Sequence, residues 1–164
     1  MNIKNKLILS SCIQAALYLL IGITVLLGYR YVANQASTAN AFDNQAKYLQ
    51  MMLRGVNEIM VTEGTNPAIE LAKEGLDQFQ LIHTNMQKDL AGTELYDIYN
   101  EKINANWVNI AENIKVFFDY DIDVESAEVM RGYGRVLTET DEMIKDISSL
   151  SLKSREAINT NYQV

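Results

Sequence analysis

The sequence is short of the residues on which several common classes of site depend. Among its 164 residues are one cysteine, one histidine and one proline. Cys12 alone cannot form an internal disulfide or a two-cysteine metal site, and His83 alone cannot supply a histidine-rich one. With a single proline and eight glycines the chain has few turn residues, which favours helices over a β-sandwich or an α/β enzyme.

The patterns that accompany catalysis are also missing. There is no Ser/His/Asp set, no phosphate-binding loop, no HExxH and no CxxCH haem-attachment motif. A Glu-x-x-His pair for a di-iron bundle would need an acid at Gln80. A net charge of −7 does not suit a nucleic-acid partner. We therefore expect no enzyme activity, no cofactor and no metal ion.

The charge that is present is divided between two parts of the chain. Residues 1–30 hold three basic residues and no acid, which gives +3. Residues 31–164 hold the other 11 basic residues and all 21 acids, which gives −10 and accounts for the total of −7. Such a division indicates that the two parts occupy different environments.

The first part contains an apolar run from Leu7 to Tyr29 without a charge. As a helix its 23 residues would span about 34 Å, enough for a hydrocarbon core of about 30 Å. Lys4 and Lys6 precede the run, so the positive-inside rule places residues 1–6 in the cytoplasm and residues 30–164 outside. The alternative is a cleavable signal peptide, but its apolar region is typically only about 7–15 residues long. Either interpretation exports the acidic part.

The exported part shows four stretches of helical periodicity separated by breaks at Gly64, Gly92 and the acidic residues 119–125. We expect the first helix to end at Glu63–Gly64, and the second to begin with Asn66 as its N-cap and Pro67 as its first helical residue. Thr93 is expected to cap the third helix, with Asn100 on its apolar stripe, and Asp123 to cap the fourth. The predicted stripes are Phe42, Ala46, Leu49, Leu53, Val56 and Met60; Ile69, Ala72, Leu76, Phe79, His83, Met86 and Leu90; Tyr96, Ile103, Trp107, Ile110, Ile114 and Phe117; and Val129, Tyr133, Val136, Thr140, Met143, Ile147, Leu150, Ser154 and Ala157.

Four amphipathic helices with short connections predict an all-α fold, an up-down-up-down antiparallel four-helix bundle preceded by one transmembrane helix that continues into helix 1. After four passes, helix 4 returns to the membrane. We expect the chain to be cut, after Val164, before a second transmembrane helix.

One membrane helix that runs unbroken into an exported four-helix bundle resembles the sensor domains of bacterial methyl-accepting chemotaxis proteins and of related histidine kinases and diguanylate cyclases. The stretches 53–58 (LRGVNE) and 61–65 (VTEGT) resemble the corner between helices 1 and 2 in some of these sensors. The resemblance covers the whole chain in pattern. No cytoplasmic signalling module is present in it.

The resemblance implies a receptor of the bacterial inner membrane whose periplasmic domain binds a small molecule and signals by displacement of helix 4. It implies a homodimer about helix 1, and we expect a small organic acid or an amino acid as ligand. A sensor of a histidine kinase or a diguanylate cyclase is the alternative within this class. Outside it, the alternative is a membrane-anchored structural or adaptor protein without a small-molecule ligand.

The residues that we expect to contact a ligand lie on helices 1 and 4, which are neighbours in an up-down bundle. Arg54 lies about as far before the first corner as Arg131 lies after the third, so a guanidinium clamp on a carboxylate is feasible. The alternative is ordinary surface pairing of the arginines with acids three or four residues away. The candidate ligand-binding residues are Arg54, Asn57, Arg131, Tyr133 and Arg135.

Other polar and aromatic residues favour a structural interpretation. His83, on an apolar stripe, is expected to be a hydrogen-bonded core residue. Tyr96, Tyr99, Trp107 and Tyr133 are expected to be core rather than a ligand pocket. The acidic residues 119–125 begin like a calcium loop, but Val124 and Met130 occupy the positions of its glycine and bidentate glutamate, so we interpret them as a solvated corner.

Overall fold

The computed structural model describes residues 3–160 as helices joined by short loops, with no β-strand in that range. Residues 1–2 and 161–164, and the side chains of residues 1–10 and 160, lie outside this description. They include Lys4, Lys6 and Val164, on which the predicted cytoplasmic N-terminus and the predicted cut of the chain depend. The all-α prediction is confirmed for the described residues.

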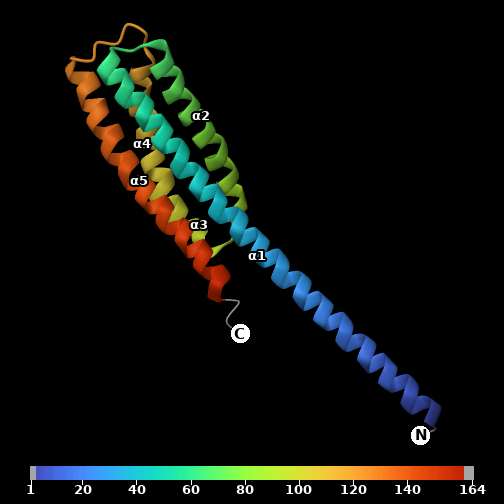
Figure 1. Ribbon diagram of the computed structural model, residues 1–164. Coiled ribbons are helices and arrows are strands. Elements are labelled where there is room, and N and C mark those ends of the chain that lie inside the picture. Colours follow the sequence, from blue (N-terminus) through green and yellow to red (C-terminus); the bar gives the residue numbers. More distant parts are fainter. Residues whose placement is uncertain (1–2, 161–164) are drawn as a thin grey trace.

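Helix α1 (Ile3–Thr62) is a single helix of 60 residues, about 90 Å long at 1.5 Å per residue. Its N-terminal half projects away from the other helices and its C-terminal half packs against them (Figure 1). Nothing in residues 7–29 interrupts the helix, because the run holds no proline. Glu63 and Gly64 follow α1 with φ angles of 56° and 83°, so the expected left-handed end is confirmed.

Helix α2 (Asn66–Asp89) begins one residue earlier than predicted. Its N-cap is Thr65, in an extended conformation, and Asn66 is already helical. The predicted Asn66 cap is therefore wrong, because Pro67 is tolerated at either of the first two helical positions, where its missing N–H costs nothing. At the other end of α2, Gly92 has a φ of 80° and ends the segment as expected.

The third segment is less regular than the sequence pattern predicts. It comprises α3 (Glu94–Tyr99), the π-helix η1 (Asn100–Asn104), α4 (Ala105–Asn113) and the 3₁₀-helix η2 (Ile114–Phe118). The π-turn shifts the helical register, so Tyr99 is fully buried and Asn100 is exposed. The prediction that Asn100 lies on the apolar stripe is therefore wrong, and Tyr99 takes that place.

Helix α5 (Ala127–Thr160) follows residues 119–126, which we call the acidic loop. The Oγ atom of Ser126 accepts a hydrogen bond from the backbone N–H of Val129 at 3.3 Å, which is the side-chain N-cap geometry. Asp123 instead accepts the N–H of Glu125 inside the loop. The predicted Asp123 cap is therefore wrong, because the loop extends three residues further than expected.

The C-terminal half of α1 lies beside α2 and α5, and α4 lies beside α5 (Figure 1). We call these packed helices, residues 39–160, the helical head. The loop after α1 and the acidic loop meet at the end of the head far from the projecting half of α1, and the C-terminal end of α5 lies at the opposite end (Figure 1). A Cβ on Gly64 would lie 2.7 Å from Ile122 Cγ2, which shows how closely the two loops pack.

The core of the head follows the predicted stripes with small shifts. On α1 the fully buried positions include Met52 and Ile59, whereas Leu53 and Met60, which the pattern placed on the stripe, are only partly buried. On α2, Gly75 replaces Leu76 as the buried position. The helices approach closely there, because a Cβ on Gly75 would lie 2.5 Å from the backbone N of Met52.

Candidate functional site between helices α1 and α5

The side of α1 that faces α5 carries polar contacts at two levels. At the level far from the projecting half of α1, the Tyr133 hydroxyl donates a hydrogen bond to Asn57 Oδ1 at 2.9 Å. We call this pair the distal contact. Tyr133 is partly buried against the core, and Asn57 is exposed. The structure thus brings together two of the five predicted ligand-binding residues, one from each helix.

The three predicted arginines are exposed and are not joined to one another. Arg54 Nε donates to Glu58 Oε1 of its own helix at 2.9 Å, with 75% of the Arg54 side chain exposed. The Arg131 side chain forms no hydrogen bond or ion pair with any described residue. Arg135 lies near Glu139: burial raises the pKa of this carboxyl, and the positive charge of Arg135 opposes that effect. Arg54 and Arg135 thus lie beside acids of their own helices, as the pairing alternative expects, whereas the Arg131 side chain has no such partner.

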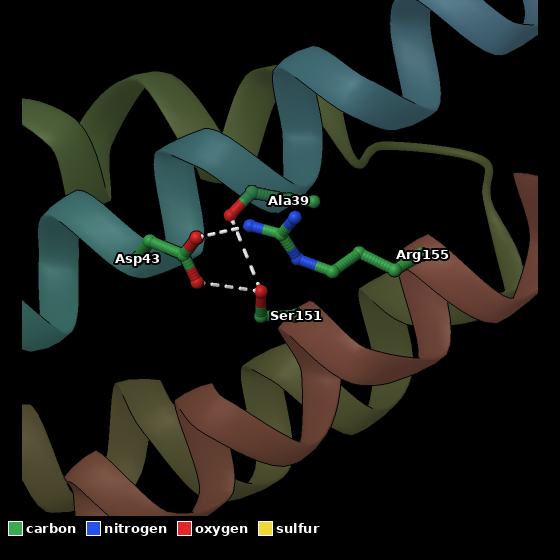
Figure 2. A network of polar contacts seen from close by, with 4 residues as sticks. All are labelled: Ala39, Asp43, Ser151 and Arg155. Atoms are coloured by element: carbon green, nitrogen blue, oxygen red, sulfur yellow. Dashed lines mark hydrogen bonds and ion pairs between the residues drawn. The ribbon is translucent and has the colours of Figure 1, made fainter.

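At the level where α5 ends, the carboxylate of Asp43 on α1 accepts hydrogen bonds from two residues of α5 (Figure 2). Ser151 Oγ donates to Asp43 Oδ1 at 2.6 Å and lies 3.4 Å from the carbonyl oxygen of Ala39. Arg155 donates from its guanidinium to the second carboxylate oxygen. We call Asp43, Ser151 and Arg155 the basal contact.

The sequence interpretation missed the basal contact. The available signal was the four-residue spacing of Ser151 and Arg155, which places both on one face of a helix. Their partner Asp43 lies 108 residues from Ser151. No spacing rule connects residues so far apart.

Between these two levels the core contains a buried polar cluster. His83 is 2% exposed, and its two ring nitrogens face Tyr99 and Asn104. The Nδ1–hydroxyl distance to Tyr99 is 2.7 Å, and the Nε2–Oδ1 distance to Asn104 is 3.3 Å. The prediction that His83 is a hydrogen-bonded core residue is confirmed. The members of the cluster are Gln45, His83, Gln87, Tyr99 and Asn104.

The π-helix explains how one histidine reaches both partners. Tyr99 and Asn104 are five residues apart, and an i→i+5 turn places such residues on the same face, one turn apart. In a regular α-helix they would diverge by about 140°. The local irregularity therefore creates the site around the imidazole.

The hydrogen bonds in the cluster fix the proton positions. Gln45 Nε2 donates to the Tyr99 oxygen at 2.6 Å, so the Tyr99 O–H is free to donate to His83 Nδ1. Asn104 Oδ1, which also accepts from Gln87, then accepts the His83 Nε2–H. Burial lowers the pKa of His83, and its hydrogen bond to Asn104 only partly opposes this. Burial also raises the pKa of Tyr99. The cluster is thus neutral near pH 7.

The aromatic residues around the cluster form a packed core. The rings of Phe79 and Trp107 lie 4.4 Å apart, and Trp107 Nε1 donates to Gln80 at 2.6 Å. Tyr99 and Trp107 are 0% and 6% exposed. The core interpretation of these two aromatics is therefore confirmed.

Among the described residues there is no group of three histidine, cysteine or acidic side chains arranged to hold a metal ion. In the acidic loop, the side chains of Asp119 and Asp123 accept the backbone N–H groups of Asp121 and Glu125, both at 3.1 Å. These carboxylates stabilise turns of the loop.

Comparison of the chain with models of protein families, with curated proteins and with solved structures found no match.

Proposed function

We propose that this chain is the extracytoplasmic sensor region of a bacterial transmembrane receptor of the chemoreceptor type. In this proposal residues 7–29 cross the inner membrane, and residues 30–164 form an up-down-up-down four-helix bundle in the periplasm. The observation that carries the proposal is α1, whose 60 residues run without interruption from the apolar run into the core of the head.

The exposure of the apolar run supports a membrane span. An 18-residue window within this helix has a mean hydropathy of 2.0, and none of the window is buried inside the molecule. The core helix of a soluble protein would bury such a surface, whereas a lipid bilayer covers it. The 23-residue length of the run supports its retention as an anchor, because the apolar region of a cleavable signal peptide is typically only about 7–15 residues long.

The contacts between α1 and α5 support signalling by displacement. α5 ends beside the part of α1 that leaves the head (Figure 1). A membrane helix joined to this end of α5 would therefore move when α5 shifts along α1. The distal contact is an exposed hydrogen bond, and the ion pair of the basal contact is half-exposed, so both contribute little stability and exchange readily, whereas Ser151 of the basal contact is buried. A ligand that favours one packing of α5 over another would therefore shift the equilibrium between them.

Topology is the first test. Cys12 is the only cysteine, so Cys12→Ser gives a thiol-free background in which Ser148→Cys, on the exposed face of α5, reports accessibility. In intact bacterial cells with a permeable outer membrane, we expect an impermeant maleimide to label Ser148→Cys. Labelling only after lysis would place the head in the cytosol and overturn the proposal.

Signalling is the second test. Residues 1–160 are fused to the second membrane helix and cytoplasmic half of a chemoreceptor, and kinase activity is followed while compounds are screened. We expect at least one small molecule to change kinase activity, and Asn57→Ala with Tyr133→Phe to alter the response. A correctly oriented chimera that no compound regulates would contradict the receptor function and favour the anchored adaptor.

A further inference from the structure

A large cavity opens at the basal end of the head, beside the basal contact. Its volume is about 940 Å³, which is within the range of about 300–1,000 Å³ typical of sites for small molecules. Three elements line it: α1 just after the apolar run, the corner between α2 and α3, and the last turns of α5. None of the five ligand-binding residues predicted from the sequence lies in its wall.

One wall of the cavity carries an unsatisfied polar group. Ser154 of α5 is 1% exposed, and its Oγ atom has no hydrogen-bond partner among the described residues. Two other serines of this helix have partners: Ser148 donates to the carbonyl of Ile144 at 2.7 Å, and Ser151 donates to Asp43. A buried hydroxyl without a partner is destabilising. A polar atom of a ligand at this wall would remove that cost.

The cavity also carries charges of both signs on different elements. Asp89 and Glu94 lie at the α2–α3 corner, and Lys153 lies on α5. None of the three forms an ion pair or a side-chain hydrogen bond within residues 3–160. The acids can receive an ammonium group and the lysine a carboxylate. A zwitterion would match both.

The remainder of the wall suits the body of such a ligand. Met86 and Leu90 of the core, 2% exposed each, reach the cavity together with Ile98, and they provide an apolar surface. On α1, Asn34 and Gln35 line the cavity with primary amides, which donate and accept hydrogen bonds as peptide groups do.

We propose that this cavity binds a short peptide of two or three apolar residues with free termini. The peptide ammonium group faces Asp89 and Glu94, the carboxylate faces Lys153, and the hydroxyl of Ser154 bonds to a polar atom of the peptide. A single amino acid has the same terminal charges but fills a small part of the volume. The site deepens the proposed function, on which its exposure to the periplasm depends.

The test uses the full 164-residue chain in phosphatidylcholine nanodiscs and titration calorimetry with leucyl-alanine. We expect N-acetylation or C-amidation of this dipeptide to weaken binding about tenfold each, because each removes one charge-assisted contact. Lys153→Gln is expected to weaken binding of leucyl-alanine about tenfold and to leave the amidated peptide unaffected. Lys145→Gln, on the same helix but outside the cavity, is the matched control and should bind as the unaltered chain does.

Several outcomes would overturn the proposal. They are absence of binding, equal affinity for free leucine and the dipeptide, and binding that Lys153→Gln does not change. Ser154→Ala gives an independent reading, because it should weaken peptide binding while the free protein unfolds at an equal or higher denaturant concentration. The chimera distinguishes this site from the receptor function: peptide binding without signalling contradicts the receptor, and signalling without peptide binding contradicts only the cavity.

Discussion

Two glycines determine how closely α1 and α2 pack. A Cβ on Gly55 would lie 2.4 Å from the backbone N of Ala72, and one on Gly75 would lie 2.5 Å from that of Met52. Because both obstacles are backbone atoms, no side-chain movement can relieve the overlap. Gly134 of α5 is the opposite case, since an added Cβ there meets nothing within 4 Å.

Gly75→Ala should therefore destabilise the head although alanine favours helices. We expect a loss of about 1–3 kcal/mol in the free energy of unfolding, the usual cost of overpacking. Gly134→Ala, the matched control, should gain about 0.5–1 kcal/mol from helix propensity. Urea unfolding followed by the fluorescence of Trp107, the only tryptophan, reports on the head selectively. A neutral Gly75→Ala would show that the helices can separate at this point.

His83 should make the stability of the head depend on pH. Burial lowers its pKa below the usual 6.5, so the unfolded chain binds a proton that the folded head resists. The contribution of neutral His83 is therefore complete above pH 6.5 and is lost as the pH falls toward the folded-state pKa. We expect the free energy of unfolding to decrease between about pH 7.5 and 5.5, with a smaller decrease in His83→Gln.

The control for this comparison is internal. Burial raises the pKa of Glu139, so this residue makes the folded head more stable as the pH falls. Glu139 is present in both the unaltered chain and His83→Gln. Its effect therefore cancels in the difference between the unaltered chain and His83→Gln. Equal pH dependence in the two proteins would contradict a neutral, desolvated histidine.

At the scale of whole elements, the basal contact should govern how firmly the end of α5 is held. Asp43→Asn keeps an acceptor for Ser151 but removes the ion pair with Arg155, and Asp43→Ala removes both. We expect amide exchange in α5 beyond Ser151 to become faster in the order unaltered, Asp43→Asn, Asp43→Ala. In Asp43→Asn the global unfolding midpoint should change little, because a half-exposed ion pair contributes about 0–1 kcal/mol.

Asp141→Ala is the matched control for this prediction, because Asp141 pairs with Lys145 at 2.6 Å within α5 itself. Loss of this ion pair leaves the basal contact between α5 and α1 intact. If Asp141→Ala raised exchange at the end of α5 as much as Asp43→Ala, the effect would belong to the helix and not to its contact with α1.

The elements differ in how far the sequence predicts them. α2 has a stripe of large apolar residues at strict three- and four-residue steps, which predicts its buried face almost completely. In the third segment the predicted stripe from Ile103 to Phe117 is buried as expected, but before the π-turn Tyr99 takes the place of Asn100, because periodicity cannot reveal the residue that a π-turn adds. What selects the π-turn is the long-range arrangement of Tyr99 and Asn104 around His83 of another helix. Asn57 and Tyr133 were both candidate ligand-binding residues, but the hydrogen bond between them was not predicted, because the depth argument concerned Arg54 and Arg131. The four-residue spacing of Ser151 and Arg155 was a signal for one helix face, but nothing in the sequence linked it to Asp43.

The whole molecule divides into an exposed apolar rod and a self-contained head. Residues 11–30 are exposed throughout, and the fully buried core begins at Ala39. The rod therefore contributes no buried surface to the head. In water, however, its exposed aliphatic side chains, such as Leu19 and Val25 at 66% each, would drive association.

Residues 31–164 alone should consequently fold in water without lipid or detergent. We expect their urea midpoint, followed by Trp107 fluorescence, to match that of the full chain in nanodiscs, and light scattering to show no large aggregates. The remaining turns of α1 before Ala39 should fray, because few contacts hold them. A head that unfolds or aggregates without residues 1–30 would mean that the bilayer supplies stabilising contacts that the packing of residues 39–160 does not.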